Sequence, residues 1–336
     1  MKIFITGANG FLGRAVTDIA LENGHHVKAL VRSASKKKAE QYWGKNENLE
    51  LVHTDLRLTK PLTEALEGVD AVIHLAATKA GDFYTQFAGT VVGTESLIKA
   101  MKEAHKTNLV GISTFSVYEY LDLEEKTLID ENSLTVTDPK TRDEYCQTKL
   151  IQEELYTEFG EDNNVTIIRP GMIFGAGELW HALLGSPFGP RFLKIGSKSV
   201  LPMTYVENCA EAIVKAAERI EDPSVNGEIF NIVDDDLLTQ AEYAKLVSSK
   251  TDTPKSIPIP WSFWKLLTGS IQKFNSIFLR NRAKFPGLFA PAKVHARFKP
   301  LTYSNEKAKS LLGWQPKLSL EEAIEKSIEI EKQTND

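Results

Sequence analysis

Cysteine is scarce in this chain, where only Cys146 and Cys209 occur among 336 residues. Two cysteines this far apart provide neither a disulfide framework nor the ligand spacing of a zinc site, so no metal is expected. A reducing, cytoplasmic setting is the simplest expectation from this composition. Apolar runs of membrane-spanning length are also missing, and the segment before the first glycine is too short for a signal peptide.

Excess positive charge is absent as well. The net charge is −5, and the hydrophobic and charged fractions of 42% and 25% are ordinary for a soluble globular protein. Nucleic acid is therefore not expected as a partner. A chain of this length accommodates one large or two modest domains.

The most informative pattern near the N-terminus is a glycine-rich turn, Thr6-Gly7-Ala8-Asn9-Gly10-Phe11-Leu12-Gly13, between a predicted strand (2–6) and a predicted helix (11–23). This order is typical of a dinucleotide site. Gly7 would permit the tight turn, Gly10 the approach of a pyrophosphate, and Gly13 close packing of helix on strand. The helix N-terminus would add free N–H groups and a positive dipole end. The alternative is a plain glycine turn.

Arg32 follows the second predicted strand (26–31), where an NAD site places a carboxylate for the ribose 2′-hydroxyl. A cation suits the 2′-phosphate of NADP instead, so NADP is the expected cofactor, with NAD possible. Lys36, Lys37 and Lys38 add positive charge downstream, although a solvated helix start is the simpler explanation for them.

Strands and helices continue to alternate, with further strands predicted at 49–54, 71–75, 109–113 and 165–169 and a helix at 85–104. This order predicts an α/β fold with a doubly wound parallel sheet covered on both faces. Ligands of such sheets bind beyond the carboxyl ends of the strands. The residues that follow the strands should therefore face one crevice; they are Asp55, Ala76, Ala77, Thr114, Pro170 and Gly171.

Tyr145 and Lys149 lie four residues apart in a predicted helix (143–159), so they share a face. A neighbouring ammonium and an oxidised nicotinamide ring would both favour the phenolate of a tyrosine and make it an acid/base near neutral pH. A hydroxyl at Thr114 would hold the substrate oxygen. The alternative is a solvated helix face. A second pair with this spacing, Tyr303 and Lys307, is interpreted as capping and packing.

With these motifs, the chain resembles the extended short-chain dehydrogenase/reductase superfamily nearly from end to end. That superfamily includes NAD-dependent epimerases/dehydratases and 3β-hydroxysteroid-dehydrogenase-like enzymes. The segments that carry the resemblance are the glycine turn, Asp55-Leu56, His74-Leu75-Ala76-Ala77, Ser113 to Tyr118, Tyr145-x-x-x-Lys149, Arg169 to Gly175, Tyr205 to Ala210 and Leu312 to Pro316.

The resemblance implies roles for these residues. Tyr145 would be the acid/base, Lys149 its electrostatic partner and ribose anchor, and Thr114 the hydroxyl beside them, a place that Ser113 and Ser116 suit less well. The implied cofactor contacts are Gly7, Asn9, Gly10, Phe11, Leu12 and Gly13 at the pyrophosphate, Asp55 and Leu56 at the adenine, Leu75, Ala76 and Ala77 along the ribose path, and Pro170 and Ile173 at the nicotinamide amide.

The resemblance also implies a domain plan. A Rossmann domain would span 1–175 and be completed by part of 200–235, and most of 176–336 would form a smaller α/β cap that binds a small-molecule substrate. A homodimer paired through helices is a further implication.

Departures from the superfamily narrow the expected chemistry. Phe115 and Ser116 stand where dehydratases carry Asp-Glu, so dehydration is not expected. Met172 and the Pro202-Met203-Thr204 segment stand where many nucleotide-sugar enzymes carry residues that hold a diphosphate, and Thr90 replaces a frequent Asn near the cofactor. The expected activity is NAD(P)(H)-dependent interconversion of a secondary alcohol and a ketone. The alternatives are a nucleotide-sugar 4-epimerase with tightly held NAD and a non-catalytic cofactor-sensing module.

The C-terminal part is predicted to contain a loop-like segment (178–202), helices at 206–220, 240–249 and 320–330, and a strand at 228–233. The stretch 253–305 contains no Asp or Glu but many Lys and Arg. Within it, Trp261, Trp264, Leu267, Ile271, Phe274 and Phe278 follow a helical stripe. Three interpretations stay open: a hydrophobic lid, a peripheral contact of 257–289 with an anionic membrane, or a site for a negatively charged substrate.

Overall fold

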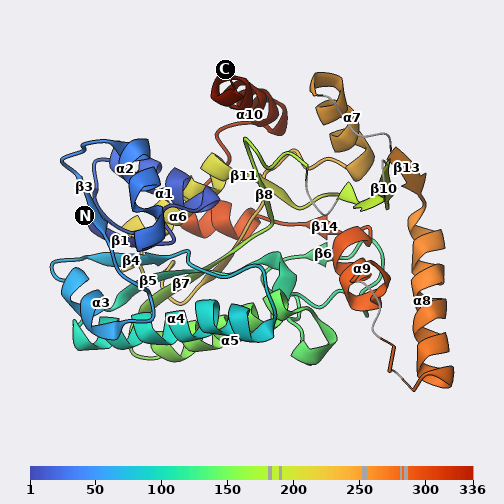
Figure 1. Cartoon of the computed structure of the whole chain (residues 1–336), viewed down its shortest axis with the longest axis horizontal. Coiled ribbons are helices and arrows are strands. Elements are labelled where there is room, and N and C mark those ends of the chain that lie inside the picture. Colours follow the sequence, from blue (N-terminus) through green and yellow to red (C-terminus); the bar gives the residue numbers. More distant parts are fainter. Residues whose placement is uncertain (181–183, 189–190, 252–255, 281, 284–286, 336) are drawn as a thin grey trace.

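The computed structural model describes residues 1–180, 184–188, 191–251, 256–280, 282–283 and 287–335. Figure 1 shows a central sheet between two layers of helices. A smaller group of strands and helices lies at the end of the molecule opposite the N-terminus.

The central sheet has seven parallel strands in the order β12-β7-β5-β4-β1-β2-β3. The strands are β1 (Lys2–Thr6), β2 (His26–Leu30), β3 (Leu49–Val52), β4 (Ala71–His74), β5 (Asn108–Ile112), β7 (Asn164–Pro170) and β12 (Ile229–Ile232). The chain builds outward from β1 in one direction and then returns to β4 and builds in the other, so the strand order reverses between β1 and β4. The predicted doubly wound parallel sheet is therefore confirmed.

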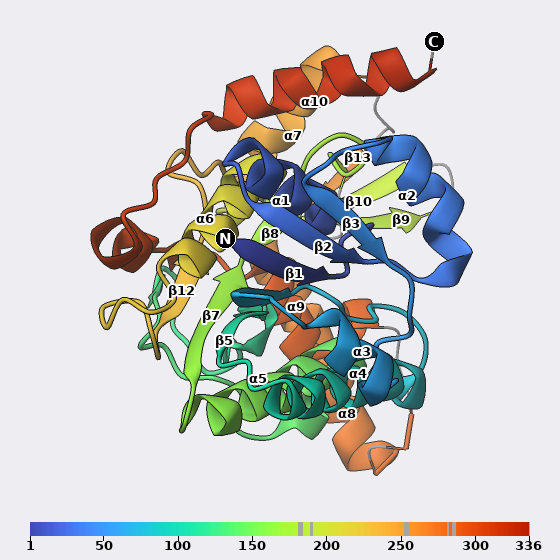
Figure 2. The ribbon, with the colours of Figure 1, turned by 90° about the vertical axis from the view of Figure 1, so that its left-hand side faces the viewer.

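Helices cover both faces of this sheet, as Figure 2 shows along the strands. The bounds are α1 (Phe11–Glu22), α2 (Lys36–Trp43), α3 (Thr59–Ala65), α4 (Phe83–Glu103), α5 (Glu144–Gly160) and α6 (Val206–Glu218). Helices α1 and α6 pack together on one face, and α3, α4 and α5 cover the other. Buried residues from near the C-terminus, Ala308, Leu312 and Trp314, join the core on the α1 side.

The remaining elements form the cap. They are β6 (Leu128–Ile129), β8 (Met172–Phe174), β9 (Ser186–Phe188), β10 (Arg191–Ile195), β11 (Met203–Tyr205), β13 (Ser256–Ile259), β14 (Thr302–Tyr303), α7 (Gln240–Lys250), α8 (Trp261–Phe278), α9 (Pro291–Phe298) and α10 (Leu320–Asn335). Within the described ranges, no helix combines the length and the apolar character that crossing a bilayer requires.

The prediction of a loop over 178–202 is wrong for the part that the structure describes, because β9 and β10 form there. β10 pairs antiparallel with β9 and parallel with β13. The antiparallel pairing with β9 is local, but Gly and Pro residues of this segment obscured it, and the parallel partner β13 begins only at Ser256. Residues 181–183 and 189–190 of this prediction lie outside the described part.

The turn between β1 and α1 is closely packed. Gly7 has a φ of +70°, and a Cβ on it would lie 2.9 Å from the backbone nitrogen of Ala76. A Cβ on Gly13 would lie 2.1 Å from the carbonyl oxygen of Gly7. Glycine at these two positions is therefore required by sterics, which lets α1 start directly against the end of β1.

A buried chain of polar side chains crosses the fold beneath this turn. His74 Nδ1 lies 2.6 Å from the hydroxyl of Thr6, and its Nε2 lies 2.9 Å from the hydroxyl of Thr94. The amide nitrogen of Gln152 donates to the same Thr94 hydroxyl at 2.8 Å. The chain thereby links β1 and β4 to α4 and α5 through groups that are all buried.

Gly13→Ala should destabilise the protein, because the backbone atoms that its Cβ would meet cannot move without shifting α1. We expect a loss of about 1–3 kcal/mol in the free energy of unfolding, measured by denaturant titration. Gly10→Ala is the matched control, since its φ is −76° and its Cβ would meet only the Gly7 carbonyl oxygen at 3.1 Å. Equal losses for the two variants would contradict the packing role of Gly13.

Protonation of His74 should also destabilise the fold. Burial holds the pKa of His74 at about 3, below its ordinary 6.5, and the charge of Lys149 acts in the same direction. Between these values the unfolded chain binds more protons than the folded chain, so stability falls as the pH falls through this window. The loss at about pH 5 should reach roughly 2 kcal/mol relative to neutral pH.

His74→Gln should flatten this pH dependence in urea titrations. His26→Asn, at the exposed start of β2, should retain it. A wild-type profile that stays level below pH 6.5 would show that His74 is not held neutral by the fold.

Candidate active site

The predicted site residues follow neighbouring strands along one edge of the sheet. Asp55, Arg32, Gly7, Ala76 and Thr114 come after β3, β2, β1, β4 and β5, which is also the order of these strands in space. The segment after β4 lies against the glycine turn, because Ala76 N donates to the Thr6 hydroxyl at 3.2 Å. The glycine turn and the segments that follow β4 and β5 therefore lie along the same edge of the sheet.

Thr114 and Tyr145 meet at the end of β5. Thr114 caps a single 3₁₀ turn, Phe115–Val117, and its hydroxyl accepts from Ser116 N at 3.2 Å. Tyr145 lies in the first turn of α5, which begins where the Asp143 side chain accepts from Cys146 N at 3.1 Å. The Thr114 hydroxyl lies close enough to the phenol of Tyr145 to influence its pKa. The two hydroxyls predicted to share a substrate oxygen are thus neighbours.

Lys149 lies one turn further along α5 and is buried. Its Nζ donates to the carbonyl oxygen of Ile112 and to Oε1 of Gln152, both at 2.5 Å. Because Ile112 ends β5 and Thr114 follows two residues later, this lysine fixes α5 against the strand that carries Thr114. Gln152 also joins Lys149 to the buried polar chain through Thr94.

The pKa values of these groups follow from their surroundings. Burial raises the pKa of Tyr145 to about 12, and the neighbouring Thr114 hydroxyl opposes this shift. Burial lowers the pKa of Lys149 to about 7, which Glu153 opposes and Lys79 reinforces. Tyr145 is therefore protonated at neutral pH and can donate its proton, while Lys149 sits near the midpoint of its titration.

Asp55, at the end of the site opposite Thr114, has two arginines near its carboxylate. Arg57 pairs with Asp55 through Nε to Oδ1 at 2.9 Å and Nη2 to Oδ2 at 2.7 Å. This pairing lowers the pKa of Asp55 to about 2, and the charge of Arg32 contributes to the shift. Arg32 is exposed at the end of β2, as expected from the sequence. Arg57 was missed, since nothing in its local pattern shows that its side chain turns back to Asp55.

The residues of the glycine turn fit a bound dinucleotide. A Cβ on Gly10 would meet only one neighbouring atom within 4 Å, so the space in front of this backbone is open. Asn9 is held by Arg14, whose Nη2 donates to Asn9 Oδ1 at 2.8 Å. Phe11 is exposed at the start of α1, where free backbone N–H groups point out of the helix. Such an arrangement accepts phosphate oxygens without further change.

Other predicted cofactor residues are held in place by packing and hydrogen bonds. Leu12 and Ile173 are partly buried between the core on the α1 side and the core of the cap. Leu56 lies beneath α4, where its side chain is 2.9 Å from the place of a Cβ on Gly93. Thr90 accepts a hydrogen bond from Thr78 N at 3.0 Å and so holds the segment that follows Ala77.

The second Tyr/Lys pair does not form a similar site. Tyr303 lies in β14, and its ring packs against Phe115 with centroids 5.7 Å apart. Lys307 makes an ion pair with Glu228 at 2.5 Å. The two side chains therefore support packing at separate places.

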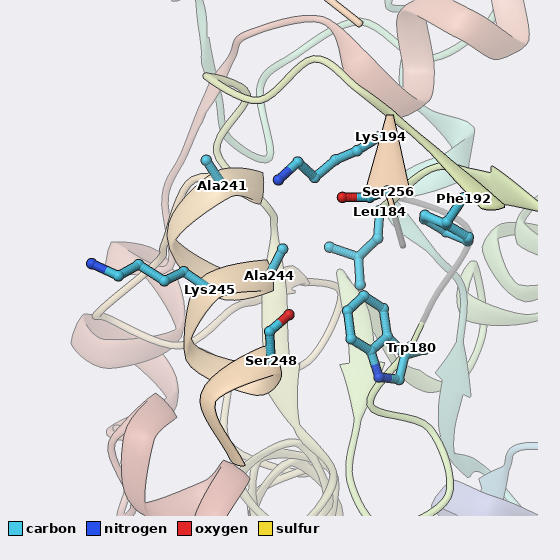
Figure 3. A pocket seen from close by; sticks show the side chains of 9 residues that line it. All are labelled: Trp180, Leu184, Phe192, Lys194, Ala241, Ala244, Lys245, Ser248 and Ser256. Atoms are coloured by element: carbon cyan, nitrogen blue, oxygen red, sulfur yellow. The ribbon is translucent and has the colours of Figure 1, made fainter. Parts of the chain in front are cut away.

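A pocket of about 120 Å³ lies within the cap, between α7 and the β9-β10-β13 sheet (Figure 3). Its wall includes Trp180, Leu184 and Phe192, and Lys194 extends over it, whereas Lys245 points away along α7. Ligand sites for drug-sized molecules occupy about 300–1,000 Å³, so this pocket has room only for a small group. None of the residues that line this pocket is one of the predicted site residues at the strand ends.

Comparison with known proteins agrees with this geometry. The family model described as "NAD dependent epimerase/dehydratase family" matches residues 3–232. Cinnamoyl-CoA reductase 1 of Petunia hybrida is 29% identical over 181 residues, which cover 52% of this chain and 54% of the relative. The 3 beta-hydroxysteroid dehydrogenase/Delta 5→4-isomerase of Mycobacterium tuberculosis is 28% identical over 343 residues, covering 96% of this chain and 88% of the relative.

Among solved structures, UDP-glucuronic acid 4-epimerase from Bacillus cereus in complex with NAD is similar with a TM-score of 0.74 and 21% identity, over the whole of both chains. This level of identity supports the fold alone. The match of the family model to residues 3–232 supports more: the chain belongs to the NAD-dependent epimerase/dehydratase family and is an NAD(P)-dependent oxidoreductase or epimerase of the extended short-chain dehydrogenase/reductase type.

Proposed function

We propose that the protein interconverts a secondary alcohol and a ketone with NADP(H), and that Tyr145 transfers the proton. The observation that carries the proposal is the proximity of the Thr114 hydroxyl to Tyr145, with Lys149 one helical turn further along α5. When bound, the nicotinamide cofactor supplies or accepts the hydride.

The chain's own residues would hold and protonate the substrate oxygen. Thr114 and Tyr145 would both donate hydrogen bonds to the carbonyl oxygen, and Tyr145 would give its proton to that oxygen as the alcohol forms. The raised pKa of Tyr145 keeps the proton in place until this step. The positive form of Lys149 would then stabilise the phenolate that remains.

The surroundings of Thr114 support an apolar substrate. Phe115 is buried in a cluster with Tyr118, Tyr120 and Leu301, and the ring of Tyr303 lies against it. No carboxylate follows Thr114 in the 3₁₀ turn, which leaves no second acid or base there for an elimination. The names of the two sequence relatives above, a cinnamoyl-CoA reductase and a hydroxysteroid dehydrogenase, are in keeping with this preference.

At the positions that commonly bind the diphosphate in nucleotide-sugar enzymes, this chain has buried apolar side chains. Met172 is buried in β8, and its backbone N donates to the carbonyl oxygen of Pro202 at 2.6 Å. Met203 is buried in β11, which pairs with β8. These side chains form part of the core of the cap, so a reductase acting on an apolar ketone is favoured over a 4-epimerase.

Tyr145→Phe should lower kcat by roughly 10²–10⁴-fold, because it removes the proton donor but keeps the ring. Its Kd for NADPH should stay close to that of the wild type. Tyr303→Phe is the matched control and should leave kcat nearly unchanged. Rates would be followed as NADPH oxidation with a panel of steroidal and smaller apolar ketones. Full turnover by Tyr145→Phe with cofactor still bound would refute the mechanism.

Arg32→Ser should weaken NADPH binding by about 10–100-fold and leave NADH binding nearly unchanged, since only the 2′-phosphate would lose a charge-assisted hydrogen bond. Lys37→Ser, which removes an exposed cation downstream of Arg32, is the control and should change neither affinity much. Calorimetric titration with both cofactors measures the two effects. An equal loss for NADH would place Arg32 outside the 2′-phosphate site.

Thermal unfolding with NADP present separates the remaining alternatives. A rise of the midpoint with UDP or UDP-sugars would support the 4-epimerase, and a rise with apolar ketones alone would support the reductase. Binding of NADPH without turnover of any ketone in the panel would support a cofactor-sensing module.

A further inference from the structure

The outer face of α8 is apolar and uncovered. Phe263, Leu266, Phe274, Ile277 and Phe278, which we call the outer stripe, have exposed fractions between 53% and 71%. At about 100° per residue they fall within roughly one third of the helix circumference and extend over about 22 Å of its length. Figure 1 shows α8 along the outer edge of the cap, on the side opposite α1 and β1.

A different side of α8 attaches it to the protein. Trp261 and Trp264 are buried with Val294 and Phe298 of α9. The ring of Trp264 lies 5.4 Å from that of Phe289, and its Nε1 donates to the carbonyl oxygen of Leu288. The outer stripe therefore does not take part in holding α8 in place. It also does not act as a lid in this structure, because its side chains face solvent.

The charges of the segment that contains α8 have one sign. Residues 253–305 contain nine Lys and Arg and no Asp or Glu, in a chain whose net charge is −5. Lys265 and Lys273 lie on the polar side of α8, and Arg280 follows its end. Lys265 makes an ion pair with Glu125 at 3.2 Å. Lys273 and Arg280 make no ion pair with any residue that the structure describes.

We propose that α8 docks on an anionic lipid bilayer, with the outer stripe inserted at the interface and the basic residues facing the headgroups. A helix with a wide apolar face, two Lys residues on its polar side, an Arg just beyond its end and no acidic residue has the composition of interfacial helices. A second copy of this chain fits the surface less well, because pairing two such helices would bring like charges together with no acidic residue on α8 to offset them.

One helix, α9, lies between the outer stripe of α8 and the first turn of α5, which carries Tyr145. Helix α9, on which α8 rests, places Lys293 4.0 Å from Asp143, the residue that caps α5 two positions before Tyr145. Ala296 of the same helix packs against the cluster of buried side chains that contains Phe115. An apolar substrate dissolved in the bilayer would thus be delivered on the side of the cap that borders the site. The docking itself does not depend on the proposed reaction.

Vesicle flotation of the full-length protein tests the proposal. The wild type should float with vesicles of phosphatidylcholine and phosphatidylglycerol, less with phosphatidylcholine alone, and less again at high salt. Phe274→Ser with Ile277→Ser should abolish flotation. Leu134→Ser with Tyr84→Ser removes two large side chains elsewhere that are more exposed than Phe274 and Ile277, and it should leave flotation unchanged.

The basic residues are tested separately from the stripe. Lys273→Gln with Arg280→Gln should lower partitioning onto the anionic vesicles by roughly fivefold for each charge removed. Lys99→Gln with Lys102→Gln on α4 is the matched control. Phe278→Trp adds a fluorescent probe at an exposed position, and its emission should shift to the blue when anionic vesicles are added.

Either of two results would overturn the proposal. One is a wild type that stays with the vesicle-free fraction under all lipid conditions. The other is a dimer in light scattering that Phe274→Ser with Ile277→Ser dissociates while flotation is unaffected, which would assign the face to a second copy. Because flotation and NADPH oxidation are separate readouts, a failure of docking leaves the proposed reaction intact, and the reverse also holds.

Discussion

One buried chain of hydrogen bonds, from Thr6 through His74, Thr94 and Gln152 to Lys149, sets the positions of both halves of the site. It begins under the glycine turn and ends on the helix that carries Tyr145. In a medium of low dielectric each of these bonds is stronger than in water, and each unpaired partner would be costly. The spacing between the glycine turn and the helix that carries Tyr145 is therefore fixed by the interior of the protein and not by its loops.

Burial has opposite effects on the pKa values of Tyr145 and Lys149. It keeps Tyr145 protonated and makes Lys149 easy to deprotonate. The bidentate ion pair of Glu153 with Arg169, at 2.8 and 2.7 Å, places a negative charge near Lys149 that partly restores its charged form. Groups with pKa values displaced in this way are typical of sites where protons move.

Features set by neighbours in sequence could be predicted, and features set by distant pairing could not. The strand at 2–6 and the helix that follows were predicted at nearly their observed bounds, because both carry a local pattern and the turn between them has one steric solution. β10 was missed because its hairpin with β9 lies in a segment with several Gly and Pro residues and its other partner, β13, lies some sixty residues away. The bond between Arg57 and Asp55 was missed for a similar reason, since it depends on how a side chain turns. Gln152 could have been found, as it follows Lys149 by three residues on α5.

The return of the C-terminal segment to the first domain has a consequence for biosynthesis. Trp314 donates from its indole nitrogen to the carbonyl oxygen of Asn208, and it lies in the same core as α1 and α6. The layer over one face of the sheet is therefore incomplete until the ribosome has made the chain as far as Trp314. During translation the strands that have already emerged would expose apolar side chains, so the nascent chain should depend on chaperones that shield such surfaces.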